Sequence, residues 1–173
     1  MKGWRGLALA PAALVAPHVA FSAVYLSVEQ AQHILYPGIA LAPVDVRLTD
    51  EQRRLVEQRT GGRARTGDLR VWRAADGAMF VVDDVVGKHE KIAYAIGIGA
   101  DGAIRGIEIL EYRESYGYEV RNASWRAQFR GKTAAAPLDL ERDIRNISGA
   151  TLSCKHLTEG IRRLLVIHDV AWR

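Results

Sequence analysis

The spacing of apolar and polar residues changes twice along the chain, from helical to strand-like and back to helical. A first pair of alternating runs lies at 69–74 and 79–86, and a second pair lies at 91–98 and 103–112. An Asp-Gly turn sequence stands between the two runs of each pair. The middle of the chain is therefore predicted to form two antiparallel hairpins.

Helical signals stand on both sides of these strands. Ser27 and Thr49 each come three residues before a glutamine, which is the capping-box pattern that opens a helix. Further helices are predicted at 122–130 and from Thr151 onward. Strands in the middle with helices at both ends predict an α+β fold in which helices flank an antiparallel sheet.

The N-terminus has the pattern of an export signal. Lys2 and Arg5 precede a short run rich in alanine, leucine and valine, and small residues follow that run. Prolines interrupt the run, which disfavours a stable membrane-spanning helix. We expect a signal peptide at residues 1–22, with an uncleaved anchor as the alternative, and one domain at 23–173.

Composition excludes several classes of function. The net charge of +4 is small and scattered, and the loss of Lys2 and Arg5 would leave about +2, so no nucleic-acid surface is predicted. Cys154 is the sole cysteine, which rules out an internal disulfide and a CxxC motif. No histidine has further ligands at useful spacing, so no metal site is predicted either.

A glycine pattern at 97–102 matches the dinucleotide-binding fingerprint G-x-G-x-x-G. That fingerprint needs a helix immediately after it, so that the helix N-terminus faces a pyrophosphate. An alternating strand follows here instead. The pattern therefore indicates a hairpin turn and no nucleotide site.

The segment Ser148-Gly149-Ala150-Thr151 leads into the last predicted helix. The first N–H groups of a helix lack internal partners, and the helix dipole adds partial positive charge there. Gly149 and Ala150 leave room for a bulky anion, and the hydroxyls of Ser148, Thr151 and Ser153 can donate to phosphate oxygens. The same residues also fit an ordinary helix cap, in which Ser148 or Thr151 satisfies the backbone and nothing binds. From the residues alone both interpretations stay open.

This tetrapeptide, followed by a hydrophobic and a hydroxyl residue, resembles the flavinylation motif of the FMN-binding domain family. That family includes the flavin-bearing exported subunits of the sodium-pumping NADH:quinone reductase and of its ferredoxin-linked relative. The resemblance implies FMN bound through a phosphoester to Thr151, at the N-terminus of the C-terminal helix. It implies that Ser148, Gly149, Ala150 and Ser153 shape the phosphate end. It also implies a partner, an FAD-dependent protein FMN transferase that installs the cofactor.

A second stretch, Glu114-Ser115-Tyr116-Gly117-Tyr118-Glu119, resembles the Glu-Thr-Pro-Gly loop that the family places beside the flavin ring. The resemblance implies that Glu114, Tyr116 and Gly117 lie near the ring, although Tyr116 stands where the family usually has proline. Trp125 falls where family members commonly carry a tryptophan. We therefore expect Trp125 to be a further cofactor-binding residue.

The chain departs from the family pattern at one more position. Many members carry an acidic residue six positions before the modified threonine, where this chain has Arg145. Asp143 is the nearby carboxylate that could take its place.

The resemblance and the N-terminal pattern together predict an exported flavoprotein. We expect it in the periplasm or on the outer face of the cytoplasmic membrane, where it would transfer electrons between membrane-associated electron-transport proteins. The alternative is a flavin-dependent reductase of a small exported substrate. A binding module without flavin is the third interpretation, and it goes with the ordinary helix cap.

Overall fold

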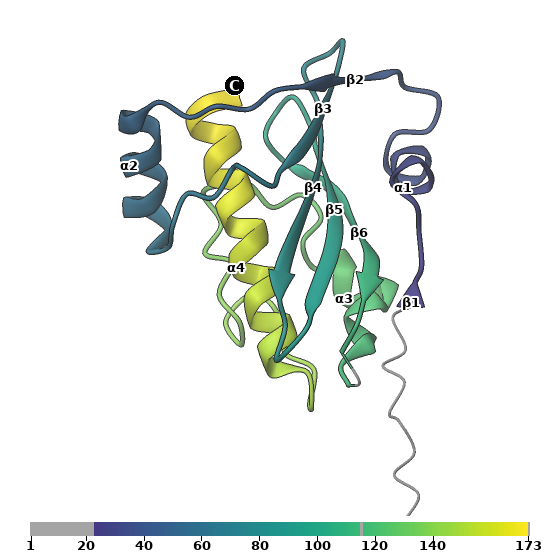
Figure 1. Cartoon of the computed structure of the whole chain (residues 1–173). Helices are drawn as coiled ribbons and strands as arrows, with labels where there is room; N and C mark the ends of the chain where they lie inside the picture. The colour runs from purple at the N-terminus through teal and green to yellow at the C-terminus, as the bar shows by residue number, and fades with distance from the viewer. Residues whose placement is uncertain (1–22, 115, 173) are drawn as a thin grey trace, which may run out of the picture.

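The computed structural model describes residues 23–114 and 116–172 (Figure 1). The predicted signal peptide at 1–22 lies outside the described residues. The elements in chain order are β1 (Ala23–Val24), α1 (Val28–Leu35), β2 (Leu41–Val44), α2 (Asp50–Thr60), β3 (Arg70–Ala74), β4 (Met79–Val86), β5 (Lys91–Ile98), β6 (Ile104–Tyr112), the 3₁₀ turn η1 (Tyr118–Arg121), α3 (Ala123–Ala127), α4 (Thr151–Ile167) and the π-helical turn η2 (His168–Trp172).

The strands form one antiparallel sheet in the order β1-β6-β5-β4-β3-β2. The two predicted hairpins are β3–β4 and β5–β6, and the predicted α+β class is confirmed. Both capping boxes are present as well, since the side chains of Ser27 and Thr49 accept hydrogen bonds from the backbone three residues on.

Helices cover both faces of the sheet (Figure 1). α4 crosses one face against β4 and β5, with α2 packed beside it, and α1 lies on the other face over β5 and β6. Two separate groups of buried side chains fill these layers. The larger lies under α4 and includes Tyr94, Ile96 and Leu157, and the smaller lies under α1 and includes Tyr36 and Phe80.

The glycines of the G-x-G-x-x-G pattern serve the packing of α1 and the turn after β5. A Cβ at Gly97 would lie 3.0 Å from the ring of Tyr36, whose hydroxyl is 3.0 Å from the carbonyl oxygen of Ile98. Gly102 has a φ of 80° and its N–H donates to the carbonyl of Gly99. The pattern is thus the hairpin that the sequence indicated.

Several elements meet at the end of the sheet that lies at the bottom of Figure 1. β4 and β6 finish there, β1 pairs with the end of β6, and α4 begins there. Among residues 23–114 and 116–172, no helix combines the length and the apolar character that crossing a bilayer requires.

Candidate functional site

A cavity of about 590 Å³ opens at this end of the sheet. Its walls come from the turn between β4 and β5, the segment that follows β6, and the start of α4. The lining residues are Lys88, His89, Glu114, Tyr116, Gly117, Tyr118, Glu119, Ser148, Gly149, Ala150, Thr151, Leu152 and Ser153. Pockets for small molecules commonly have about 300–1,000 Å³, so the cavity has room for a nucleotide-sized ligand. Of the residues expected to bind a cofactor, all except Trp125 line it.

The start of α4 lacks the side-chain cap that α1 and α2 both have. Its N-cap residue is Ala150, and within the described part of the chain no side chain hydrogen-bonds to the free N–H groups of the first turn. The ordinary-cap interpretation, with Ser148 or Thr151 as the cap, is therefore not what the structure shows. Gly149 has a φ of 83°, and apart from its two chain neighbours no atom of residues 23–114 and 116–172 lies within 4 Å of where a Cβ would stand. The uncapped helix start is open to an anion, which the helix dipole favours.

Thr151 is the first residue of α4, and its side chain is exposed at the cavity. Its hydroxyl oxygen accepts a hydrogen bond of 3.0 Å from the side-chain amide of Asn146. The hydroxyl is thus accessible to a second protein while being held from within its own chain. Asn146 carried no signal of this kind in the sequence, because its contact depends on how the chain turns into α4.

Ser153 has a different role from the expected one. Its side chain is buried, and its hydroxyl lies 3.0 Å from the hydroxyl of Tyr112. Tyr112 donates its own proton to the carbonyl oxygen of Tyr116 at 2.5 Å, so Ser153 must be the donor to Tyr112. Burial raises the pKa of Tyr112 and keeps it a neutral donor. The Ser153 hydroxyl proton is therefore used to fix the loop beside the cavity and is not available to a phosphate oxygen.

Glu114 ties the segment after β6 to the turn between β4 and β5. Its Oε1 accepts from the backbone N–H of His89 at 2.5 Å and of Glu90 at 2.9 Å. Burial acts to raise the pKa of Glu114, but these backbone donors outweigh it and the pKa is lowered. The ionised carboxylate thus holds the turn that brings Lys88 and His89 to the cavity, which are two residues that sequence reasoning did not select.

The outer rim of the cavity is apolar and exposed. Tyr116 is 82% exposed and Tyr118 is 59% exposed, and Leu152, which lines the cavity from the start of α4, is 42% exposed. Grouped large apolar side chains at a cavity are typical of a surface that a ligand or partner covers. Flat aromatic side chains at this rim suit the planar ring of a flavin.

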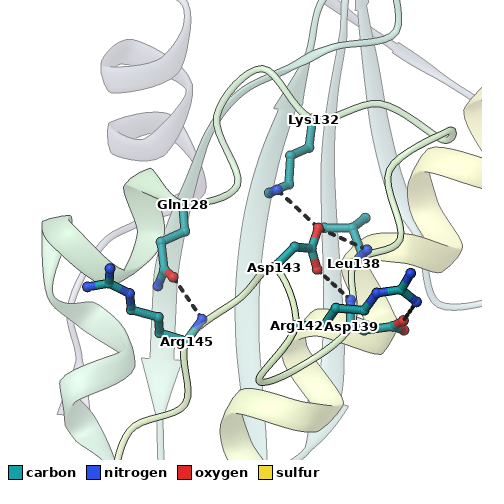
Figure 2. A network of polar contacts seen from close by, with 7 residues as sticks. All are labelled: Gln128, Lys132, Leu138, Asp139, Arg142, Asp143 and Arg145. Carbon is teal, nitrogen blue, oxygen red and sulfur yellow. Dashed lines mark hydrogen bonds and ion pairs between the residues drawn. The ribbon is translucent and has the colours of Figure 1, made fainter.

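Trp125 does not lie at the cavity. It is buried in the core against Phe129, with the ring centroids 5.1 Å apart. Its indole N–H donates to the carbonyl oxygen of Arg145 at 2.8 Å, and the N–H of Arg145 donates to Gln128 Oε1 at 2.8 Å. Figure 2 shows Gln128 reaching the Arg145 backbone. Trp125 thus fixes the chain six residues before Thr151, and the cofactor-binding role expected of it stays a prediction.

Asp143 is the centre of a second anchor on the same segment (Figure 2). Its carboxylate accepts from the N–H groups of Asp139 at 2.7 Å and Leu138 at 3.2 Å, and it pairs with Lys132 at 3.1 Å. Burial acts to raise the pKa of Asp143, but the lysine and the backbone donors prevail, so the pKa lies below the ordinary value of 3.8. Asp143 is thus committed to holding the loop before α4, while the Arg145 side chain is exposed.

This anchor makes the loop before α4 sensitive to acid. Because the folded pKa of Asp143 is depressed, its carboxylate stabilises the fold above pH 3.8, and this contribution is lost as the pH falls through the folded pKa. Asp143→Asn is expected to lower the free energy of unfolding by about 1.5–3 kcal/mol at neutral pH. The difference from the wild type should vanish below the folded pKa. Denaturant unfolding at a series of pH values measures this.

The neighbouring Asp139 provides the control for this experiment. Its carboxylate pairs with Arg142 at 3.5 Å in an exposed position, and such pairs contribute little. Asp139→Asn should therefore leave both the stability and its acid dependence nearly unchanged. An equal loss in the two variants would contradict a special role for Asp143.

Comparison of the sequence with known protein families indicates a ligand for this cavity. Residues 87–166 match the family model described as the FMN-binding domain. The chain carries an FMN-binding domain. A search of curated proteins found no match to the chain. The matched region begins at the turn between β4 and β5 and runs into α4, so every residue that lines the cavity belongs to the FMN-binding domain.

The residues of the cavity suit both the phosphate and the flavin ring of FMN. The uncapped start of α4 and the open space at Gly149 suit the phosphate, and Lys88 lines the same cavity. The exposed rings of Tyr116 and Tyr118 suit the flavin. The family match and the cavity together thus support FMN as the cofactor of this chain.

Proposed function

We propose that this chain is an exported electron carrier whose FMN is joined by a phosphoester to Oγ1 of Thr151. The observation that carries the proposal is the exposed hydroxyl of Thr151, at the first residue of an uncapped helix, inside the cavity of an FMN-binding domain. A hydroxyl in this place is accessible to an FAD-dependent flavin transferase. It also lies beside the backbone donors that would receive the phosphate once it is attached.

The chain's own residues bind and orient the cofactor. The first-turn N–H groups of α4 offset the phosphate charge with Lys88, and Gly149 leaves the approach open. Tyr116 and Tyr118 shield the ring, and the bond from Tyr112 to the Tyr116 carbonyl fixes the loop that carries them. Bound FMN supplies one- or two-electron redox chemistry. Thr151 is a tether and takes no part in turnover.

The predicted export signal supports a location outside the cytoplasm, with membrane electron-transport proteins as donor and acceptor. A covalent link suits such a place, because a dissociated flavin would be lost by dilution. Stopped-flow reoxidation with quinones, haem proteins and small oxidants separates a carrier from a reductase. Fast turnover with one small molecule would favour the reductase.

The covalent link is tested by the intact mass of protein made together with the transferase. The wild type should gain the mass of FMN less one water, whereas Thr151→Ala should gain nothing and show no in-gel flavin fluorescence. Thr151→Ser keeps a hydroxyl and should still be modified, which controls for damage to the fold. An unmodified wild type, beside a transferase shown to act on another flavoprotein, or a modified Thr151→Ala would overturn the proposal.

A further inference from the structure

Asn146 makes two hydrogen bonds that together define the orientation of its side-chain amide. Its Oδ1 accepts from the backbone N–H of Ile147 at 2.9 Å, and only the oxygen of an amide can accept. The nitrogen must therefore be the end that faces Thr151, and it donates to Oγ1 at 3.0 Å. Because Oγ1 is the acceptor in this bond, the hydroxyl proton of Thr151 is not used by it.

The backbone before Asn146 is fixed by protein contacts alone. Arg145 is held through both its N–H and its carbonyl oxygen, by Gln128 and by Trp125. The side chain of the preceding Ile144 is buried in the core. Asn146 therefore reaches Thr151 from a segment that protein contacts hold in place, which is what a preorganised site requires.

We propose that Asn146 is a positioning residue for the attachment of FMN, which holds the Thr151 side chain so that Oγ1 faces the incoming phosphorus. This inference rests on the proposed function. In the attachment step, a bond forms between Oγ1 and the FMN phosphorus of FAD, and the phosphoanhydride bond to AMP breaks. AMP leaves with the electron pair of the broken bond, the hydroxyl proton passes to water, and nothing is oxidised or reduced. A fixed rotamer of the nucleophile removes an entropic cost from this step.

The kinetic test measures the rate of FMN attachment with purified transferase and FAD, at varied concentrations of this protein. Asn146→Ala should lower kcat for attachment about tenfold or more, because small misplacements of a nucleophile have effects of up to roughly 100-fold. The KM for this protein should change little. Asn146→Asp keeps the acceptor for the Ile147 N–H but cannot donate to Oγ1 when ionised, so it should show the same loss.

Asn122→Ala is the matched control, because Asn122 is exposed before α3 and its side chain caps no helix. This variant should be modified at the wild-type rate. Thermal unfolding of all three variants should remain close to that of the wild type. Wild-type attachment rates in Asn146→Ala, or attachment by Asn146→Asp as fast as or faster than by the wild type, would overturn the inference.

A second measurement does not depend on attachment. In the unmodified chain, NMR scalar couplings of Thr151 should report a single χ1 rotamer, and in Asn146→Ala they should report averaging over several. Averaged couplings in the wild type would reject the positioning role, even if attachment occurs. A fixed rotamer in a wild type that is never modified would instead reject the proposed function.

Discussion

Asp83→Ala is expected to lower the free energy of unfolding by about 3–5 kcal/mol, the usual effect of removing one partner from a buried ion pair. The Asp83 side chain on β4 is 1% exposed and pairs with the guanidinium of Arg163 on α4, which is 14% exposed. The hydroxyl of Tyr94 on β5 donates to the same carboxylate at 2.9 Å. Removal of the carboxylate leaves a buried cation and a buried hydroxyl without their acceptor. Equilibrium unfolding in denaturant measures the loss.

The dependence of Arg163 on this one carboxylate strengthens the expectation. Within the described residues, the Nε of Arg163 is buried without a hydrogen-bond partner. The charge of the guanidinium is compensated by its ion pair with Asp83. Asp83→Leu combined with Arg163→Met removes both charges and should be far less damaging than Asp83→Ala. That double variant separates the effect of an uncompensated charge from the effect of a lost contact.

Asp84→Ala is the control at the next position of the same strand. Its side chain is partly exposed and pairs with Lys91 at 3.4 Å and Arg65 at 4.0 Å, so its removal should lower stability by less than about 1 kcal/mol. Similar losses in the two alanine variants would contradict the importance assigned to the buried pair.

The same group of residues sets where α4 lies on the sheet. A Cβ on Gly160 of α4 would stand 2.8 Å from the hydroxyl of Tyr94 and 2.8 Å from Cγ1 of Val85. The helix therefore approaches the sheet closely at this point, and Arg163 reaches Asp83 one turn later. Because α4 is one continuous helix from Thr151 to Ile167, this contact also sets the place of its first residue at the cavity.

Local signals in the sequence predicted the elements that local chemistry determines. The capping boxes at Ser27 and Thr49 located α1 and α2, and the Asp-Gly turns located the four long strands. β1 and β2 were missed, because short edge strands depend on their partners, and β2 contains Pro43, which is tolerated only at an edge. The helix predicted at 122–130 is shorter, since α3 ends at Ala127 and turns follow.

At the site, the sequence motif located the residues that are contiguous in the chain and missed those brought in by folding. Ser148 to Ser153 line the cavity together with Glu114 and Gly117, which the two short motifs had singled out. Lys88 comes from the turn between β4 and β5, Tyr112 comes from the end of β6, and Trp125 is buried in the core. Such placements depend on strand register and on helix packing, which a single sequence does not encode in any local pattern.

Gly117→Ala is expected to lower the free energy of unfolding by about 3 kcal/mol and to reduce FMN attachment strongly. Gly117 has a φ of 90°, a conformation that costs a residue with a Cβ about 1–2 kcal/mol. Its Cβ would also stand 2.6 Å from the hydroxyl of Tyr112 and 2.9 Å from the Cβ of Ala150, and such overpacking costs about 1–3 kcal/mol. Tyr112 cannot move away cheaply, because Ser153 and the Tyr116 carbonyl both hold its hydroxyl.

Gly61→Ala separates the two causes of this loss. Gly61 has a φ of 71° at the end of α2. Beyond its chain neighbours, no atom of the described residues lies within 4 Å of the place that a Cβ would take, so this variant tests backbone strain without a clash. It should lose about 1–2 kcal/mol and keep full FMN attachment. Because Gly117 lines the cavity and lies against Ala150, the residue before α4, its variant should instead displace the start of α4 and so the hydroxyl of Thr151. Equal unfolding free energies and equal attachment in the two variants would show that Gly117 does not support the site.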